Sequence, residues 1–165
     1  MNSSQFNKIL VVKHGSLGDI AFSILAMASI KQFFNHATID LLTEEKYVNF
    51  LSNSNYFNSV FKDNRKGIID SLKVILKINQ NKYDLIIDLQ NSKRTNNYWS
   101  FLKFISEVKV NGSRSNCDIQ YVIPPQGTES PQQGLYNQLK LLGVNEIYQN
   151  VDWLSRDITA INEDK

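Results

Sequence analysis

The sequence predicts an α/β fold, a Rossmann-like parallel sheet with helices on both faces. Three observations predict it. Residues 8–34 combine an apolar strand, a glycine-containing turn and an amphipathic helix. A second apolar strand at residues 85–87 also ends in a polar turn. Strand and helix patterns alternate along the chain, which is typical of a parallel sheet covered by helices.

The first strand and turn give the strongest pattern. Residues 9–12 (ILVV) are four consecutive apolar residues, as expected for a parallel strand buried on both faces. Residues 13–19 (KHGSLGD) form the turn, and from Ile20 apolar residues recur at helical spacing. In open α/β sheets, ligands bind at the carboxyl ends of the strands, where such a turn leaves backbone N–H groups free. The sequence therefore predicts a binding site at this edge.

The other elements follow in order. Strands are expected at 37–42, 59–61, 85–87 and 108–110, and helices at 44–51, 68–78, 95–106 and 134–142. Residues 112–133, which hold all three prolines, are expected to form a long loop. The expected strand order, 3-2-1-4-5, places the turn after the first strand beside the loop after the fourth. Residues 1–150 are predicted to be one domain and residues 151–165 a polar linker or tail.

Composition excludes several classes of protein. The length of 165 residues suits one domain, and 18 Lys and Arg against 16 Asp and Glu give no nucleic-acid signature. The single cysteine, Cys117, excludes an internal disulfide framework and suggests a reducing, cytoplasmic environment. No signal peptide and no apolar run of about 18 residues is present, so no transmembrane helix is expected. No cluster of His, Cys and Asp suggests a metal site.

The turn carries one acidic residue, Asp19, and two interpretations of it remain open. A carboxylate in the first turn of a helix is favoured by about 0.3–1 kcal/mol, so Asp19 could simply cap the helix. It could also be a general base at the mouth of a cleft. Lys13, His14 and Ser16 lie beside it and supply donors for a polar or anionic ligand. Gly15 and Gly18 are expected to be structural glycines of the turn.

Two segments resemble a known family. Residues 13–20 (KHGSLGDI) resemble the K/R-x-x-S-L/M-G-D-V/I turn of the heptosyltransferases, glycosyltransferase family 9. Residues 83–90 (YDLIIDLQ) resemble the family's Y-D-x-x-I-D-x-Q-G segment, except that Asn91 stands where the family usually has Gly. Gly15 stands where the family often has Ser. The likeness spans about residues 8–143, the N-terminal half of such an enzyme.

The resemblance implies a GT-B glycosyltransferase that inverts the anomeric configuration without a metal or other cofactor. Asp19 matches the catalytic base of the family. The acceptor would bind to this N-terminal half, and the donor, an ADP-sugar, would bind to a C-terminal Rossmann-like domain. Gln90 is expected to orient the first turn. The candidate acceptor-binding residues are Lys13, His14, Ser16, Arg65, Gln90, Lys93 and Arg94.

The implied acceptor is a lipopolysaccharide core or another glycan, and the implied macromolecular partner is a C-terminal domain or chain. Membrane contact is expected to be at most peripheral, at the inner face of the inner membrane. Nothing after Asn150 resembles a second Rossmann domain, so the chain alone is expected to be inactive and to transfer a heptosyl or hexosyl group only when completed.

Two alternatives remain. The first is a dinucleotide-binding oxidoreductase domain, in which Glu44 or Glu45 would bind ribose. The glycine pattern Gly15-x-x-Gly18-x-x-Ala21 departs from the G-x-G-x-x-G of that class. The second is a non-catalytic remnant or partner subunit that keeps the fold without the activity.

Overall fold

The computed structural model describes residues 3–155. At its centre is a six-stranded sheet with the order β3-β2-β1-β4-β5-β6, in which every neighbouring pair is parallel. The strands are β1 (Lys8–Val12), β2 (Thr38–Thr43), β3 (Ser59–Lys62), β4 (Leu85–Asp88), β5 (Lys109–Gly112) and β6 (Ile119–Gln120). The predicted order of the first five strands is confirmed.

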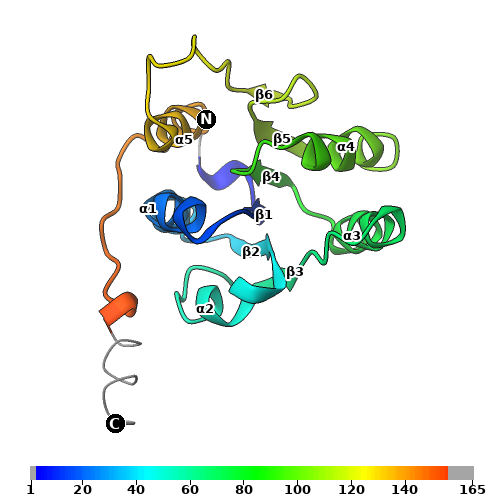
Figure 1. The fold of residues 1–165 in the computed structure, drawn as a ribbon, viewed down its shortest axis with the longest axis horizontal. Coiled ribbons are helices and arrows are strands. Elements are labelled where there is room, and N and C mark those ends of the chain that lie inside the picture. Colours follow the sequence, from blue (N-terminus) through cyan, green and yellow to red (C-terminus); the bar gives the residue numbers. More distant parts are fainter. Residues whose placement is uncertain (1–2, 156–165) are drawn as a thin grey trace, which may run out of the picture.

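Helices cover both faces of the sheet (Figure 1). The helices α1 (Leu17–Phe33), α2 (Val48–Ser52) and α5 (Pro131–Lys140) lie on one face. The helices α3 (Ile68–Asn81) and α4 (Lys93–Leu102) lie on the other face. Two short 3-10 helices, η1 (Ser3–Gln5) and η2 (Glu45–Tyr47), precede β1 and α2. The Rossmann-like fold expected from the sequence is therefore confirmed.

The core is divided by the sheet into two layers. Side chains of a strand alternate between faces, so Ile9 and Val11 of β1 pack in the α1 and α5 layer. Leu10 and Val12 pack in the α3 and α4 layer, together with Trp99. Because both faces of β1 are buried, its uninterrupted apolar run is explained.

Several elements differ from the sequence prediction, and three of the differences have a clear physical reason. The expected loop at 112–133 contains a short sixth strand, β6, paired with β5. Helix α5 begins at Pro131 rather than residue 134, because the Ser130 side chain caps it and proline suits the first helical position. Helix α4 ends at Leu102. In the next turn, the N–H groups of Phe104 and Ile105 bond to carbonyls three residues earlier, and Ile105, which lies within the helix expected at 95–106, is 44% exposed.

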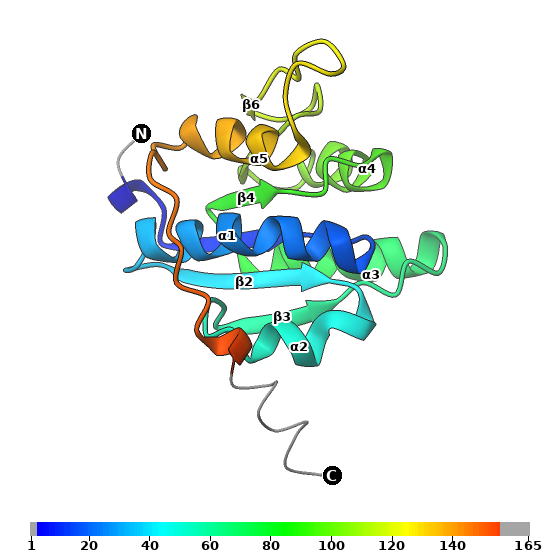
Figure 2. The ribbon, with the colours of Figure 1, turned by 60° about the vertical axis from the view of Figure 1, so that its left-hand side comes forward.

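The segment after α5 crosses α1 and reaches α2 (Figure 2). The Tyr148 N–H donates to Ser29 Oγ at 2.8 Å, and the Tyr56 hydroxyl donates to the Asn150 carbonyl at 2.8 Å. Trp153 is 5% exposed, and its indole N–H donates to the Tyr56 hydroxyl at 2.9 Å. Trp153 was expected in the polar tail, so the packed unit extends at least to this residue. Residues 156–165 of that tail lie outside the described residues.

Candidate functional site

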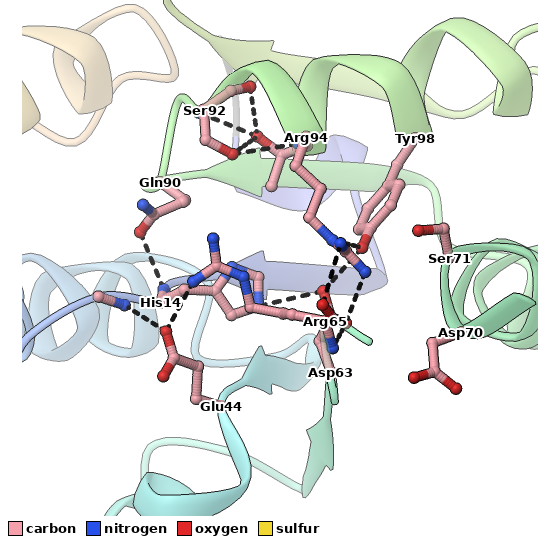
Figure 3. A network of polar contacts seen from close by, with 12 residues as sticks. His14, Glu44, Asp63, Arg65, Asp70, Ser71, Gln90, Ser92, Arg94 and Tyr98 are labelled. Carbon is pink, nitrogen blue, oxygen red and sulfur yellow. Dashed lines mark hydrogen bonds and ion pairs between the residues drawn. The ribbon is translucent and has the colours of Figure 1, made fainter. Parts of the chain in front are cut away.

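A network of charged and polar side chains lies at the carboxyl edge of the sheet (Figure 3). His14 follows β1, Glu44 follows β2, Asp63 follows β3 and Gln90 follows β4. Helix α4 adds Arg94 from its first turn. Parallel strands end at the same edge, so residues far apart in the sequence meet here. The edge includes the switch point between β1 and β4, where such sheets bind ligands.

Asp19 belongs to the N-terminal cap of α1. Ser16 is the N-cap residue, and its backbone N–H and hydroxyl donate to Asp19 Oδ2 at 2.7 and 2.8 Å. These bonds from the Ser16 side chain and backbone lower the pKa of the exposed Asp19 carboxyl, which is therefore ionised at neutral pH. Within residues 3–155, the hydrogen bonds of this carboxylate all reach Oδ2. Oδ1 is left for a ligand.

The two glycines of the motif have different roles. Gly15 has a φ of +117°, and a Cβ placed on it would lie 2.6 Å from Asp19 Oδ2. Only glycine suits this position. Gly18 lies within the first turn of α1, and a Cβ there would meet only Ser16 Oγ, at 3.7 Å. Gly18 is therefore not required by the turn, contrary to the expectation from the sequence.

Lys13 and His14 lie beneath the surface of the site. The Lys13 ammonium donates to the Leu89 carbonyl at 3.3 Å. Burial lowers the pKa of Lys13, although Asp19 and Asp88 act in the opposite direction. The His14 backbone N–H donates to Gln90 Oε1 at 3.0 Å. These bonds tie the turn after β1 to the loop after β4.

Asp63 is the centre of the buried part of the network. Its Oδ2 accepts a hydrogen bond from the Tyr98 hydroxyl at 2.8 Å, and its Oδ1 accepts one from the backbone N–H of Arg65 at 2.9 Å. The Arg94 guanidinium and His14 Nε2 lie 3.6 and 3.7 Å from its carboxylate. Burial lowers the pKa of His14 to about 4. The negative charges of Asp63 and Glu44 act to raise this pKa, and the positive charges of Arg65 and Arg94 act to lower it. His14 is therefore neutral at pH 7.

Arg65 and Arg94 line an open cleft of about 640 Å³ at this edge, together with Glu44, Glu45, Lys46, Asp63 and Asn64. Arg65 NH1 lies 2.8 Å from Glu44 Oε1, and Arg94 NH1 donates to the Arg65 carbonyl at 3.3 Å. Arg94 Nε donates to the Tyr98 hydroxyl. Arg94 NH2 is buried and has no hydrogen-bond acceptor among residues 3–155. Arg94 NH2 also lies 3.6 Å from Asp63 Oδ1. Two guanidinium groups that line one cleft suit a carboxylate or phosphate.

The remaining candidates occupy different positions. Gln90 is half-buried between the two loops, and Ser16 is exposed beside Asp19. Lys93 is exposed at the start of α4, and the cleft lining passes from Arg65 to Arg94 without it. The structure thus brings Arg65 and Arg94 together at the cleft. Lys93 precedes Arg94 in the sequence but does not line the cleft.

The sequence did not predict that Glu44 accepts a hydrogen bond from the turn. It also did not predict that Asp63 and Tyr98 belong to the site. Glu44 Oε1 accepts from the Gly15 N–H at 3.1 Å. Desolvation acts to raise the pKa of Glu44, but hydrogen bonds from Gly15, Lys46 and Arg65 outweigh it and lower the pKa. Glu44 and Asp63 each follow directly after a strand, and that position was the signal available in the sequence.

The loop after β4 is organised by Asp88, which is fully buried. Its Oδ1 accepts from the N–H groups of Gln90 and Asn91, and its Oδ2 accepts from the Trp99 indole at 2.8 Å. Burial raises the pKa of Asp88 despite these bonds. Asn91 has a φ of +51°, a left-handed conformation that glycine and asparagine adopt most readily. The backbone therefore explains why Asn replaces the expected glycine here.

Among residues 3–155, no group of three or more His, Cys, Asp and Glu side chains could hold a metal ion. In the same residues, no helix has the length and apolar character needed to cross a membrane.

The fold and this edge define a Rossmann-like α/β domain with a network of polar side chains at its switch point. The chain matches no protein-family model. It is 32% identical over 87 residues to lipopolysaccharide heptosyltransferase 1 of Campylobacter coli, a match that covers 50% of this chain and 25% of that protein. The resemblance to glycosyltransferase family 9 is confirmed by this relative and by the structural neighbours, over the N-terminal part of such proteins.

Solved structures of the family share this fold. A glycosyltransferase of family 9 from Veillonella parvula superposes with a TM-score of 0.71 at 20% identity, covering 91% of this chain and 47% of that chain. Escherichia coli heptosyltransferase WaaC with ADP-2-deoxy-2-fluoro heptose gives a TM-score of 0.60 at 14% identity. The superposition covers 88% of this chain and 51% of that chain. The chain therefore spans about half the length of these GT-B structures.

Proposed function

We propose that this chain is the acceptor-side domain of an inverting glycosyltransferase similar to the ADP-heptose:lipopolysaccharide heptosyltransferases. The observation that carries the proposal is the position of Asp19. It lies at the switch-point turn, is ionised, and has one carboxylate oxygen left for a ligand. The relative from Campylobacter coli supports the same class of reaction.

Asp19 acts in this proposal as the general base. The acceptor hydroxyl would donate to Oδ1, while Ser16 keeps Oδ2 in place. The acceptor oxygen attacks the anomeric carbon of the donor sugar, the bond to the nucleoside diphosphate breaks, and the configuration inverts. Because the low pKa of Asp19 makes it a weak base, the proton moves as the new C–O bond forms and the hydroxyl becomes acidic.

The cleft with Arg65 and Arg94 binds carboxylates or phosphates of the acceptor, and the exposed Lys93 adds to the positive charge nearby. The buried residues Lys13 and His14 and the half-buried Gln90 hold the two loops in place. The nucleotide-sugar, an ADP-sugar, binds to a second Rossmann-like domain, in cis or as a separate chain. The acceptor is a lipopolysaccharide core or a related glycan, and the enzyme works at the cytoplasmic side of the inner membrane.

The oxidoreductase alternative needs a carboxylate free to bind ribose. In this structure Glu44 is engaged by Gly15 and Arg65, and Glu45 is engaged by Lys62. We therefore expect no measurable binding of NAD to the chain by calorimetry, whereas low-micromolar affinity would favour the oxidoreductase interpretation.

The test completes the chain with a donor-binding domain, fused or as a second chain, and measures sugar transfer from ADP-sugar. Asp19→Asn should lower the rate by about 10²–10⁴-fold, the usual contribution of general-base catalysis. The loss of a charge in the first helical turn costs only about 0.3–1 kcal/mol in unfolding free energy.

Asp70→Asn is the matched control, because Asp70 occupies the first turn of α3 and also accepts a backbone hydrogen bond. It should reduce stability slightly and leave transfer unchanged. Transfer by Asp19→Asn within about threefold of the parent rate would show that Asp19 only caps the helix.

A further inference from the structure

Helix α3 carries a second apolar face that nothing in the described structure covers. Four large apolar side chains of this helix are exposed: Ile68 (79%), Ile69 (70%), Leu72 (42%) and Leu76 (53%). At 100° per residue, these four positions fall within an arc of about 100° around the helix axis. They form one continuous stripe, which we call the α3 stripe.

The α3 stripe is separate from the core contact of the helix. Val74, Ile75 and Ile78 are buried and face the sheet with the other residues of their core layer. The sequence predicted a helix at residues 68–78 without separating these two faces. Exposed apolar side chains that gather in a stripe usually mark an interaction surface.

The surroundings of the stripe are basic. Residues 66–82 contain the four lysines Lys66, Lys73, Lys77 and Lys82 and a single acidic residue, Asp70. The Asp70 carboxylate accepts a hydrogen bond from the backbone N–H of Lys66 at 3.2 Å, so this carboxylate lies at the start of the helix. Apolar side chains flanked by lysines are typical of helices that lie on anionic lipid surfaces. Two copies packed through this face would instead bring their lysines together.

The stripe also begins next to the candidate site. Ile68 lies three residues after Arg65, and the first turn of α3 lies beside the polar network in Figure 3. The arginine cleft and the start of the α3 stripe therefore share one end of the molecule. A surface bound to the stripe would lie close to whatever the cleft binds.

We propose that the α3 stripe is a docking surface for an anionic lipid bilayer. Ile68, Ile69, Leu72 and Leu76 insert among the acyl chains near the headgroups, and Lys66 and Lys73 contact the anionic headgroups. The docking would place the cleft of Arg65 and Arg94 at headgroup level, within reach of a lipid-linked acceptor. Only this last consequence rests on the proposed function, because lipid binding needs no sugar transfer.

The test measures binding of the full chain to vesicles by flotation. Vesicles of phosphatidylglycerol and phosphatidylethanolamine are compared with vesicles of phosphatidylcholine alone. The parent chain should bind the anionic vesicles preferentially. The triple variant Ile69→Gln, Leu72→Gln, Leu76→Gln should bind them at least about tenfold more weakly. The double variant Lys66→Gln, Lys73→Gln should lose about fivefold for each lysine on anionic vesicles only.

The matched controls lie on the opposite face of the sheet. Phe22 of α1 is 57% exposed and Leu141, after α5, is 42% exposed, so Phe22→Gln with Leu141→Gln removes two exposed apolar side chains from that face. Lys140→Gln removes a charge from α5. These variants should bind as the parent does. If the triple variant does not fold by circular dichroism, Ile68→Gln replaces it, since Ile68 is the most exposed member.

Absence of vesicle binding would overturn the proposal, as would equal binding to neutral and anionic vesicles or equal losses in the control variants. Sedimentation in which the triple variant turns a dimer into a monomer would assign the stripe to a second copy instead. Sugar transfer to a deacylated, soluble acceptor is measured separately, with the chain completed by a donor-binding domain. Its failure with intact vesicle binding would contradict the proposed function and leave the docking surface in place.

Discussion

The backbone N–H of Gly15 donates a hydrogen bond to Glu44 Oε1 at 3.1 Å. This bond joins the turn after β1 to the residue that follows β2, 29 positions later in the chain. The same carboxylate oxygen lies 2.8 Å from Arg65 NH1. Glu44 therefore connects the turn that carries Asp19 with the cleft that carries the arginines.

We expect Glu44→Ala to destabilise the fold. The substitution leaves the Gly15 N–H without its acceptor and removes the partner of Arg65, a loss of about 1–3 kcal/mol in unfolding free energy. Chemical denaturation monitored by circular dichroism measures it. Glu45→Ala is the control, because Glu45 is exposed and pairs with Lys62 on the surface. Equal denaturation midpoints for the two variants would contradict the role assigned to Glu44.

The two glycines of the turn should respond oppositely to alanine. Gly15→Ala should cost about 1–3 kcal/mol, because its φ of +117° is strained for alanine and the new Cβ would clash with Asp19 Oδ2. Gly18→Ala should be neutral or stabilise by up to about 1 kcal/mol, since Gly18 is helical and its surroundings are open. Thermal unfolding of both variants measures the difference. A larger loss at Gly18 would show that the turn is assigned incorrectly.

His14 should make stability depend on pH. Its pKa of about 4 in the folded state lies below the usual 6.5 of the unfolded chain. Between these values the unfolded state binds more protons, so the unfolding free energy should rise with pH, by up to about 1.4 kcal/mol per unit. Below about pH 4 both states bind the proton and this contribution is constant.

The variant His14→Gln isolates that contribution. Its unfolding free energy, measured by urea denaturation at several pH values, should change less than that of the parent between pH 4 and 6.5. The remaining change on the acid side comes from carboxyl groups with lowered pKa, such as Asp19 and Glu44. Their contribution is present above the carboxyl range and is lost as the pH falls through it. Parallel curves for the two proteins would show that His14 is not held neutral by burial.

Trp153 should stabilise the domain although it follows the predicted boundary at residue 150. Trp153→Ala removes a buried indole that packs against Phe50 and Tyr56, and we expect a loss of about 3 kcal/mol. Trp153→Phe keeps most of the ring contact and should lose less. Differential scanning calorimetry compares them. An unchanged melting temperature for the alanine variant would place the end of the packed unit before this residue.

The sequence by itself determined the first five strands of the sheet and their order. The apolar runs in β1 and β4 follow from burial of both strand faces, and the alternation of strands with helices dictates parallel pairing. Local chemistry also set the start of α1, where Ser16 and Asp19 form a capping box that needs only neighbouring residues. Because the strands follow a regular period, the sequence pattern was sufficient to predict them. The sequence also placed Asp19 in the first turn of the helix, whereas its pairing with Ser16 came from the structure.

The tertiary structure decided which polar residues meet. Glu44 reaches Gly15, Asp63 reaches His14 and Tyr98, and Trp153 reaches Tyr56 across separations that no local pattern encodes. It also separated the two apolar faces of α3, since periodicity cannot tell a side chain that faces the sheet from one that faces outward. Burial and long-range hydrogen bonds depend on how elements pack, and packing is a property of the whole domain.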